Sequence, residues 1–243
     1  MNATTDVGKL ILIPTPLGDD GLPALPETTL AEARRLRVFI VERLRTARRF
    51  LRAAGSTADF DNECTFYELD KRTQERELPG FLVKALKEGR DIGLLSEAGA
   101  PAVADPGARV VRLAHRHGMR VVPLVGPSSL LLALMSSGMN GQTFAFKGYL
   151  SPKRQELGRD LLQLERDSAD RSETQLWIEA PYRNRANYEI ALEVLQPATL
   201  FGIATDLTLS TEYTRTLPVE QWRKEEVPDL HKRPTIFLLF VEK

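Results

Sequence analysis

Three loops built from small, turn-forming residues are the parts of this chain whose residue types could hold a ligand. They are residues 13–19, 96–107 and 123–129. In the second loop, Gly99, Pro101, Pro106 and Gly107 leave little side chain between the backbone and a bound molecule. Each loop follows an apolar run that is typical of a buried strand, and ligands of open α/β sheets bind at the carboxyl ends of strands. The three loops together therefore predict one binding site made largely of backbone groups.

The third loop ends in Ser128 and Ser129, just before a run with helical spacing. A serine at that place caps a helix, and the N–H groups at the helix start can bind a carboxylate. Three carboxylates near the predicted strand ends, Glu42, Glu97 and Asp105, are candidates for a general base. The same carboxylates could instead cap helices or accept hydrogen bonds from loop backbone, so no catalytic residue is assigned.

The elements that must position these loops follow an alternating pattern. Apolar, β-branched runs predict strands at residues 10–13, 37–41, 91–95 and 120–124. Segments of helical period predict helices at 44–54, 74–88, 108–117 and 128–137. This alternation is typical of βα units around a mainly parallel sheet.

The pattern changes at residues 138–142, a turn-rich segment that we interpret as a linker. After it, strands are predicted at 143–149, 174–179, 199–204, 212–216 and 235–241, and helices at 153–166 and 184–195. The predicted fold class is therefore α/β, with an N-terminal α/β domain over residues 1–138 and a C-terminal α/β domain over residues 142–243.

The composition excludes several classes of protein. Of the 243 residues, 42% are hydrophobic and 27% are charged, as in ordinary globular proteins. No apolar run approaches the roughly 20 residues of a membrane span, so we expect a cytoplasmic protein with no membrane partner. Cys64 is the only cysteine, so neither a disulfide nor a metal site is predicted. The glycine-rich patterns of dinucleotide-binding folds, P-loops and nucleophile elbows are also absent.

The net charge of zero is unevenly distributed along the chain. Residues 31–52 contain eight arginines and only two acidic residues, Glu32 and Glu42, whereas residues 59–77 are acidic. A basic patch of this kind could contact phosphate groups. The alternative is a solvated helix face that pairs with the acidic segment, and the sequence favours neither interpretation.

Five segments, read in order, carry a family resemblance. They are residues 14–19 (PTPLGD), 96–101 (SEAGAP), 105–107 (DPG), 122–129 (VPLVGPSS) and 177–183 (WIEAPYR). Together they resemble the successive signatures of the tetrapyrrole methylase superfamily of S-adenosyl-L-methionine-dependent methyltransferases. Within it, the chain is similar to the branch that methylates a ribose 2′-hydroxyl of a cytidine in small-subunit ribosomal RNA. The resemblance covers nearly the whole chain.

The resemblance implies a tetrapyrrole methylase fold of two α/β domains, with S-adenosyl-L-methionine in a cofactor cleft between them, and a homodimer. Carried over onto matching positions, it implies cofactor contacts from Pro16, Glu97, Ala98, Gly99, Pro101, Ser128, Ser129, Ala180, Pro181 and Arg183, with Pro234 as a further candidate. Loops of small residues suit this task because they can offer backbone groups without steric cost.

Two departures from the branch concern the substrate side. Its second loop normally reads Ser-Asp-Ala-Gly-Thr-Pro, whereas Glu97 and Ala100 stand here in place of the aspartate and the threonine. These changes move the carboxylate by one methylene and remove one hydroxyl. The branch also has a Glu-Asp-Thr-Arg segment, of which only Glu42 and Arg45 match.

The first hypothesis for function is a methyltransferase that acts on RNA, with ribosomal RNA ribose 2′-O-methylation implied by the resemblance. One alternative keeps the enzyme class and changes the substrate to a tetrapyrrole or another small molecule, which needs a deep apolar cleft. Another alternative is a non-catalytic regulatory module that binds S-adenosyl-L-methionine. Arg183 could bind a carboxylate or an RNA phosphate, or could form a surface ion pair.

Overall fold

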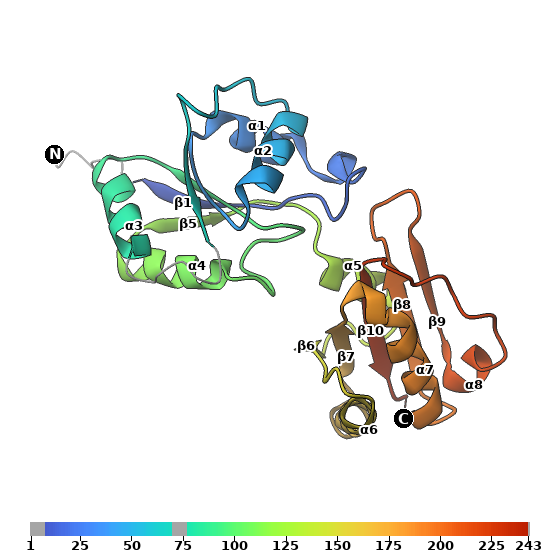
Figure 1. The fold of residues 1–243 in the computed structure, drawn as a ribbon. Helices are drawn as coiled ribbons and strands as arrows, with labels where there is room; N and C mark the ends of the chain where they lie inside the picture. Colours follow the sequence, from blue (N-terminus) through green and yellow to red (C-terminus); the bar gives the residue numbers. More distant parts are fainter. Residues whose placement is uncertain (1–7, 70–76, 243) are drawn as a thin grey trace. The chain divides into compact units, whose positions relative to one another are not determined.

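A computed structural model describes residues 8–69 and 77–242 of the chain. The chain divides into two units, Met1–Ser128 and Ser129–Lys243, which are described here one at a time (Figure 1).

The first unit is built on a wholly parallel five-stranded sheet of order β3-β2-β4-β1-β5. Its strands are β1 (Lys9–Ile13), β2 (Val38–Val41), β3 (Thr65–Glu68), β4 (Ile92–Leu95) and β5 (Arg120–Pro123). Its helices are α1 (Glu27–Arg35), α2 (Leu44–Ala53), α3 (Glu77–Lys87) and α4 (Gly107–Arg116). The predicted βα units and parallel sheet are confirmed.

Helices cover both faces of this sheet, which is why β2 and β4 are buried along their whole length. Phe39 of β2 packs with Phe50 and Leu51 of α2 on one face. Ile40 of the same strand packs with Leu82 of α3 on the other face. Figure 1 shows α1 and α2 on one side of the sheet and α3 and α4 on the opposite side.

The second unit has a mixed five-stranded sheet of order β6-β7-β10-β8-β9. Its strands are β6 (Phe144–Tyr149), β7 (Thr174–Ile178), β8 (Leu200–Thr205), β9 (Tyr213–Pro218) and β10 (Thr235–Phe240). Only β6 and β7 pair in parallel, and the other pairs are antiparallel. Its helices are α5 (Ser129–Ser137), α6 (Arg154–Arg171), α7 (Asn184–Val194) and the short α8 (Val219–Trp222).

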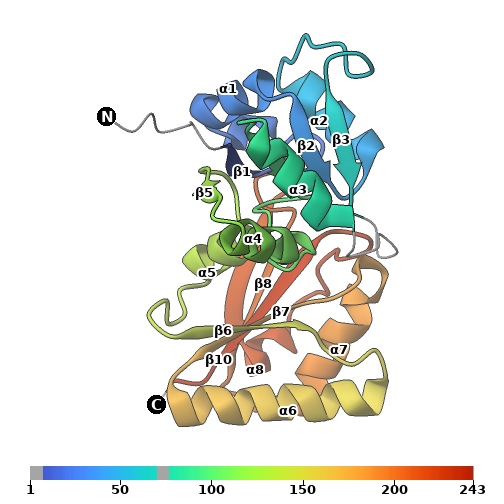
Figure 2. The ribbon, with the colours of Figure 1, turned by 90° about the vertical axis from the view of Figure 1, so that its left-hand side faces the viewer.

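Alternate residues of the second sheet face two different layers. Phe201 and Phe237 point into an aromatic core with Trp177, beneath α6 and α7. Gly202, the next residue of β8, faces Met139, which follows α5. Figure 2 shows α6 as the long helix that runs along this unit.

The division of the chain lies earlier than the predicted linker at residues 138–142. Helix α5, which we expected in a first domain ending at residue 138, belongs to the second unit and contacts β8, β9 and β10. The physical reason is its apolar sequence, because Ala133 and Leu134 are buried there. The turn-rich residues after α5 are therefore a connection within the second unit.

The sequence analysis missed two elements of the first unit and shortened one helix of the second. Helix α1 has two threonines near its start, which lower helix propensity, although Glu27 in its first turn and Arg34 and Arg35 in its last are good signals. Strand β3 is a short edge strand inside the acidic segment. Helix α6 continues five residues beyond the predicted end, to Arg171. Residues 74–76 of the predicted helix 74–88 lie outside the described residues.

Among the described residues, no helix combines the length and the apolar character needed to cross a membrane.

Candidate functional site

The three loops of the first unit meet at the ends of β1, β4 and β5. Thr15 and Gly99 join the first loop to the second by exchanging two backbone hydrogen bonds, of 3.0 and 3.1 Å. The Ser96 hydroxyl also donates to the Gly99 carbonyl oxygen at 2.8 Å, and the Thr15 hydroxyl donates to the Ser96 carbonyl oxygen at 3.3 Å. These buried hydroxyls therefore fix the two loops against each other.

Gly99 lies where all three loops touch, and both its backbone conformation and its close neighbours favour glycine. Its φ of +75° is in the left-handed region, and an added Cβ would lie 3.0 Å from Leu17 Cδ2 and 3.5 Å from the carbonyl oxygen of Pro127. In the third loop, a Cβ on Gly126 would lie 2.3 Å from Pro14 Cβ. The glycines that the sequence singled out thus bring three backbone segments into van der Waals contact.

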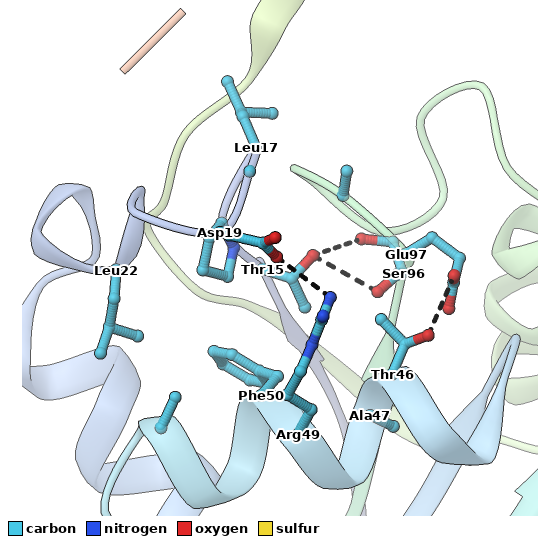
Figure 3. A pocket seen from close by; sticks show the side chains of 14 residues that line it. Thr15, Leu17, Asp19, Leu22, Thr46, Ala47, Arg49, Phe50, Ser96 and Glu97 are labelled. Carbon is cyan, nitrogen blue, oxygen red and sulfur yellow. Dashed lines mark hydrogen bonds and ion pairs between the residues drawn. The ribbon is translucent and has the colours of Figure 1, made fainter. Parts of the chain in front are cut away.

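A cavity of about 280 Å³ opens beside this junction, between the first loop, the second loop and α2 (Figure 3). Its apolar lining comes from Leu17, Leu22, Ala47, Phe50 and Ala53. Its polar lining comes from Asp19, Thr46, Arg49 and Glu97. Figure 3 shows the Arg49 side chain reaching toward Asp19, with which it forms an ion pair of 3.1 Å. A cavity with an apolar lining and a few polar groups is typical of a small-molecule site.

Glu97, which replaces the aspartate of the related branch, is held by residues that follow β2. Its carboxylate accepts a hydrogen bond from the Thr46 hydroxyl at 3.3 Å and lies 3.9 Å from Arg43 Nε. Its backbone N–H donates to the Glu42 carboxylate at 3.3 Å. The longer side chain therefore reaches across to α2, so that the loop after β4 and the segment after β2 form one wall of the cavity.

The three candidate bases have different surroundings. One oxygen of Asp105 accepts the N–H groups of Ala102 and Gly107 at 2.8 and 2.7 Å, so this carboxylate shapes its own loop. Burial raises the pKa of Asp105 against the effect of these two bonds. Burial also raises the pKa of Glu42, and the nearby carboxylates of Asp105 and Glu97 add to that increase. Glu42 has the fewest structural tasks of the three.

The second unit gathers its predicted residues at the end of β7. The buried Glu179 carboxylate accepts the Ala180 N–H at 2.6 Å and the Arg183 Nε–H at 3.0 Å. The Pro181 carbonyl oxygen accepts the Lys232 N–H at 3.2 Å, which ties this turn to the segment before β10. The Arg183 guanidinium therefore forms an ion pair inside its own motif, where it fixes the turn.

Pro234 lies beside the same turn. The antiparallel pairing of Ile236 with Ile178 brings it level with Ala180, and its carbonyl oxygen accepts hydrogen bonds from the Asp206 N–H and the Thr205 hydroxyl. The second unit thus holds Ala180, Pro181, Arg183 and Pro234 in one place.

The predicted residues of the first unit have distinct positions. Pro16, Glu97 and Ala98 line the cavity, and Gly99 forms the junction behind it. Pro101 is buried in the second loop, outside the cavity lining. Ser128 is the last residue of the first unit, and Ser129 is the first residue of α5.

The sequence analysis missed Thr15, Thr46, Arg49 and Phe50 as site residues. Thr46, Arg49 and Phe50 share one face of α2, at helical spacing next to the predicted strand end, and that spacing was an available signal. Thr15 lay inside a recognised motif, but only the fold shows that it bonds to Gly99.

Comparison with known proteins gives a family for this arrangement. The sequence profile of the tetrapyrrole (corrin/porphyrin) methylases matches residues 9–222. That range contains all ten predicted cofactor contacts, although not Pro234.

Several relatives bear the name ribosomal RNA small subunit methyltransferase I. The protein of Bacillus subtilis is 31% identical over 200 residues, which is 80% of this chain and 62% of the relative. The protein of Escherichia coli O157:H7 is 29% identical over 99% of this chain and 80% of the relative. The alignment thus spans less than two thirds of the Bacillus relative's length.

Solved structures show the same fold. The methyltransferase CobJ matches with a TM-score of 0.60 and 16% identity, over 96% of this chain and 94% of its own. The uroporphyrin-III C-methyltransferase of Thermus thermophilus, complexed with S-adenosyl homocysteine, matches with a TM-score of 0.55 and 18% identity, over 96% and 97%. From the profile match over most of its length, the chain belongs to the tetrapyrrole (corrin/porphyrin) methylase family.

Proposed function

We propose that this protein is an S-adenosyl-L-methionine-dependent methyltransferase that methylates a ribose 2′-hydroxyl of ribosomal RNA. The names of the relatives that align over most of the chain support the substrate. The observation that carries the proposal is the junction at Gly99, where three family loops meet beside a cavity. Backbone groups brought together in this way suit a cofactor with amino, carboxylate and hydroxyl groups.

The residues of the first unit fit the cofactor in their chemistry. Pro16, Ala98 and Gly99 present short side chains or none, so that backbone can approach a ligand closely. Ser128 stands directly before α5, where a helix start can bind a carboxylate. We assign these residues, together with Glu97, Pro101, Ser129, Ala180, Pro181 and Arg183, to the cofactor site. When bound, the cofactor supplies an electrophilic methyl group.

The chain's own residues then have three tasks: they must hold the acceptor hydroxyl in line with the methyl carbon, exclude water and accept a proton. Positioning is the largest of these effects, because a reaction in line requires an approach of about 3 to 3.5 Å. The apolar lining by Leu17, Leu22 and Phe50 keeps water out of the cavity. We assign Glu42 to accept the proton, because it has fewer hydrogen bonds to backbone than Asp105 and it accepts the N–H of Glu97, which lines the cavity.

Two measurements on the full chain test this function. Isothermal titration should show that the protein binds S-adenosyl-L-methionine. A titration without any heat of binding would exclude the proposed function. Incubation with methyl-labelled cofactor and small ribosomal subunits should then place label in RNA at the ribose. Label in a small molecule from a cell extract would instead identify the other substrate class, and binding without transfer would identify a regulatory module.

We further propose that the protein is a homodimer and that it works in the cytoplasm, where ribosomal subunits are found. The homodimer rests on the family resemblance, and the location rests on the proposed ribosomal substrate. Light scattering coupled to size-exclusion chromatography should give a mass near twice 27.2 kDa.

A further inference from the structure

The arginines of residues 31–52 divide into two groups by what they touch. Five of them have protein partners with close contacts: Arg34, Arg35, Arg37, Arg48 and Arg52. The other three are Arg43, Arg45 and Arg49. The sequence left open whether these arginines pair within the protein or contact phosphate groups. The structure shows protein partners at close distance for the first five, so the question of phosphate contacts concerns the other three.

The first group has structural tasks. Arg52 donates to the carbonyl oxygens of Ser56 and Ala58 and stacks over the Phe60 ring at 4.1 Å. Arg48 forms an ion pair of 2.7 Å with Asp61, in the acidic segment. These arginines fix the loop that follows α2, and their charge is already satisfied.

Arg45 and Arg49 are different, because both side chains are exposed and neither is held by a buried partner. Among the described residues, no carboxylate or hydrogen-bond partner is recorded for Arg45, and its side chain is exposed. Arg49 is paired only with Asp19, and the two side chains are 70% and 88% exposed. A pair as exposed as this contributes little to stability and gives way readily to a stronger anion.

The two arginines are four residues apart on α2, so they stand one above the other on the same face of the helix. Arg49 lines the cavity, and Arg45 lies one helical turn before it on the same side of α2. One unpaired guanidinium group and one held only by an exposed ion pair suit successive phosphate groups of one strand, since arginine binds phosphate through two parallel hydrogen bonds.

We propose that Arg45 and Arg49 bind the backbone phosphates of the RNA substrate next to the nucleotide that is methylated. This inference rests on the proposed function. Asp19 restrains this binding, because it holds Arg49 until a phosphate displaces it. Arg43, which lies 3.9 Å from Glu97, is not part of the pair.

Binding of a labelled single-stranded RNA at several salt concentrations tests the proposal. Arg45→Gln with Arg49→Gln should weaken binding at least tenfold and reduce the slope of log K against log salt by about 1.4, which is two phosphate contacts. Asp19→Asn should tighten binding, because it frees Arg49. Arg112→Gln with Arg116→Gln is the matched control: these two exposed arginines of α4 are also four residues apart and carry the same charge, and their replacement should change neither value. An unchanged slope in the double variant would overturn the proposal.

Methylation kinetics separate this proposal from the function on which it rests. The double variant should raise KM for ribosomal subunits by a larger factor than it lowers kcat at saturating subunits. Arg45→Gln alone changes no residue that lines the cavity, so it should raise KM while the affinity for S-adenosyl-L-methionine stays near that of the wild type. A wild-type KM in the double variant would refute the phosphate contacts and leave the function intact. A wild-type protein that transfers no methyl group to RNA would refute the function itself.

Discussion

Thr15 and Gly99 exchange two backbone hydrogen bonds, and this single bridge joins the loops that follow two neighbouring parallel strands, β1 and β4. Because the Gly99 carbonyl oxygen also accepts the Ser96 hydroxyl, the bridge leaves few conformations open to either loop. The site is thus preorganised by backbone contacts within one unit.

Replacement of Gly99 by alanine should lower the affinity for S-adenosyl-L-methionine at least tenfold. The new Cβ would meet Leu17 Cδ2 at 3.0 Å, and the φ of +75° adds strain of about 1 to 2 kcal/mol. Gly118→Ala is a matched control, because Gly118 has a φ of +70° and no neighbouring atom within 4 Å of an added Cβ. Isothermal titration should show a loss of affinity for S-adenosyl-L-methionine in Gly99→Ala but not in Gly118→Ala. Equal affinities of the two variants would contradict the role of the junction.

The parallel core could be predicted from sequence because its signals are local. Strand β4 is a short apolar run that ends in a loop of glycine and proline, and both features are visible in the letters alone. The unit to which α5 belongs could not be predicted. Its apolar sequence lies between the segments that form the two sheets, and its composition would allow it to pack against either sheet. The pairing of Thr15 with Gly99 and of Thr46 with Glu97 joins residues far apart in sequence, which only tertiary structure brings together.

The loop between β4 and α4 contains backbone strain that glycine should relieve. Ala102 and Ala104 have φ values of 69° and 60°, and the Asp105 carboxylate holds this conformation through the N–H groups of Ala102 and Gly107. Ala104→Gly should therefore raise the free energy of unfolding by about 0.5 to 1 kcal/mol. Ala186→Gly, at an exposed position in α7, should lower it by a similar amount. Urea unfolding measures both, and destabilisation by Ala104→Gly would show that the loop is not strained.

Glu179 should matter more to stability than an equivalent surface glutamate. Its side chain is only 2% exposed and accepts hydrogen bonds from Ala180 and Arg183, so its removal leaves a guanidinium and an amide without partners. Glu179→Ala should lower the free energy of unfolding by about 2 to 3 kcal/mol. Glu189→Ala is the control, because Glu189 forms only an exposed ion pair with Arg185 on α7. It should lower the free energy of unfolding by less than about 0.5 kcal/mol. Equal effects of the two variants in urea unfolding would show that the Glu179 pair does not fix the turn.

Glu42 should make the stability of the protein depend on pH in a direction that is unusual for a glutamate. Burial raises the pKa of its carboxyl above that of the unfolded chain, so the group contributes stability at pH values below the unfolded pKa of about 4.3. That contribution is lost as the pH rises through the higher pKa of the folded state. Glu42→Gln removes the charge and retains an oxygen that can accept the Glu97 N–H.

The variant should therefore gain stability relative to the wild type as the pH rises from about 3 to 7, by less than about 1 kcal/mol because the group is only half-buried. Asp59→Asn is a control of opposite sign, since hydrogen bonds from the Asn62 side chain and the Asp61 N–H lower the pKa of Asp59. That variant should lose stability relative to the wild type over the same range. Urea unfolding at each pH gives both differences. If the Glu42→Gln difference were constant with pH, burial would not raise the pKa of the Glu42 carboxyl, and the prediction would be wrong.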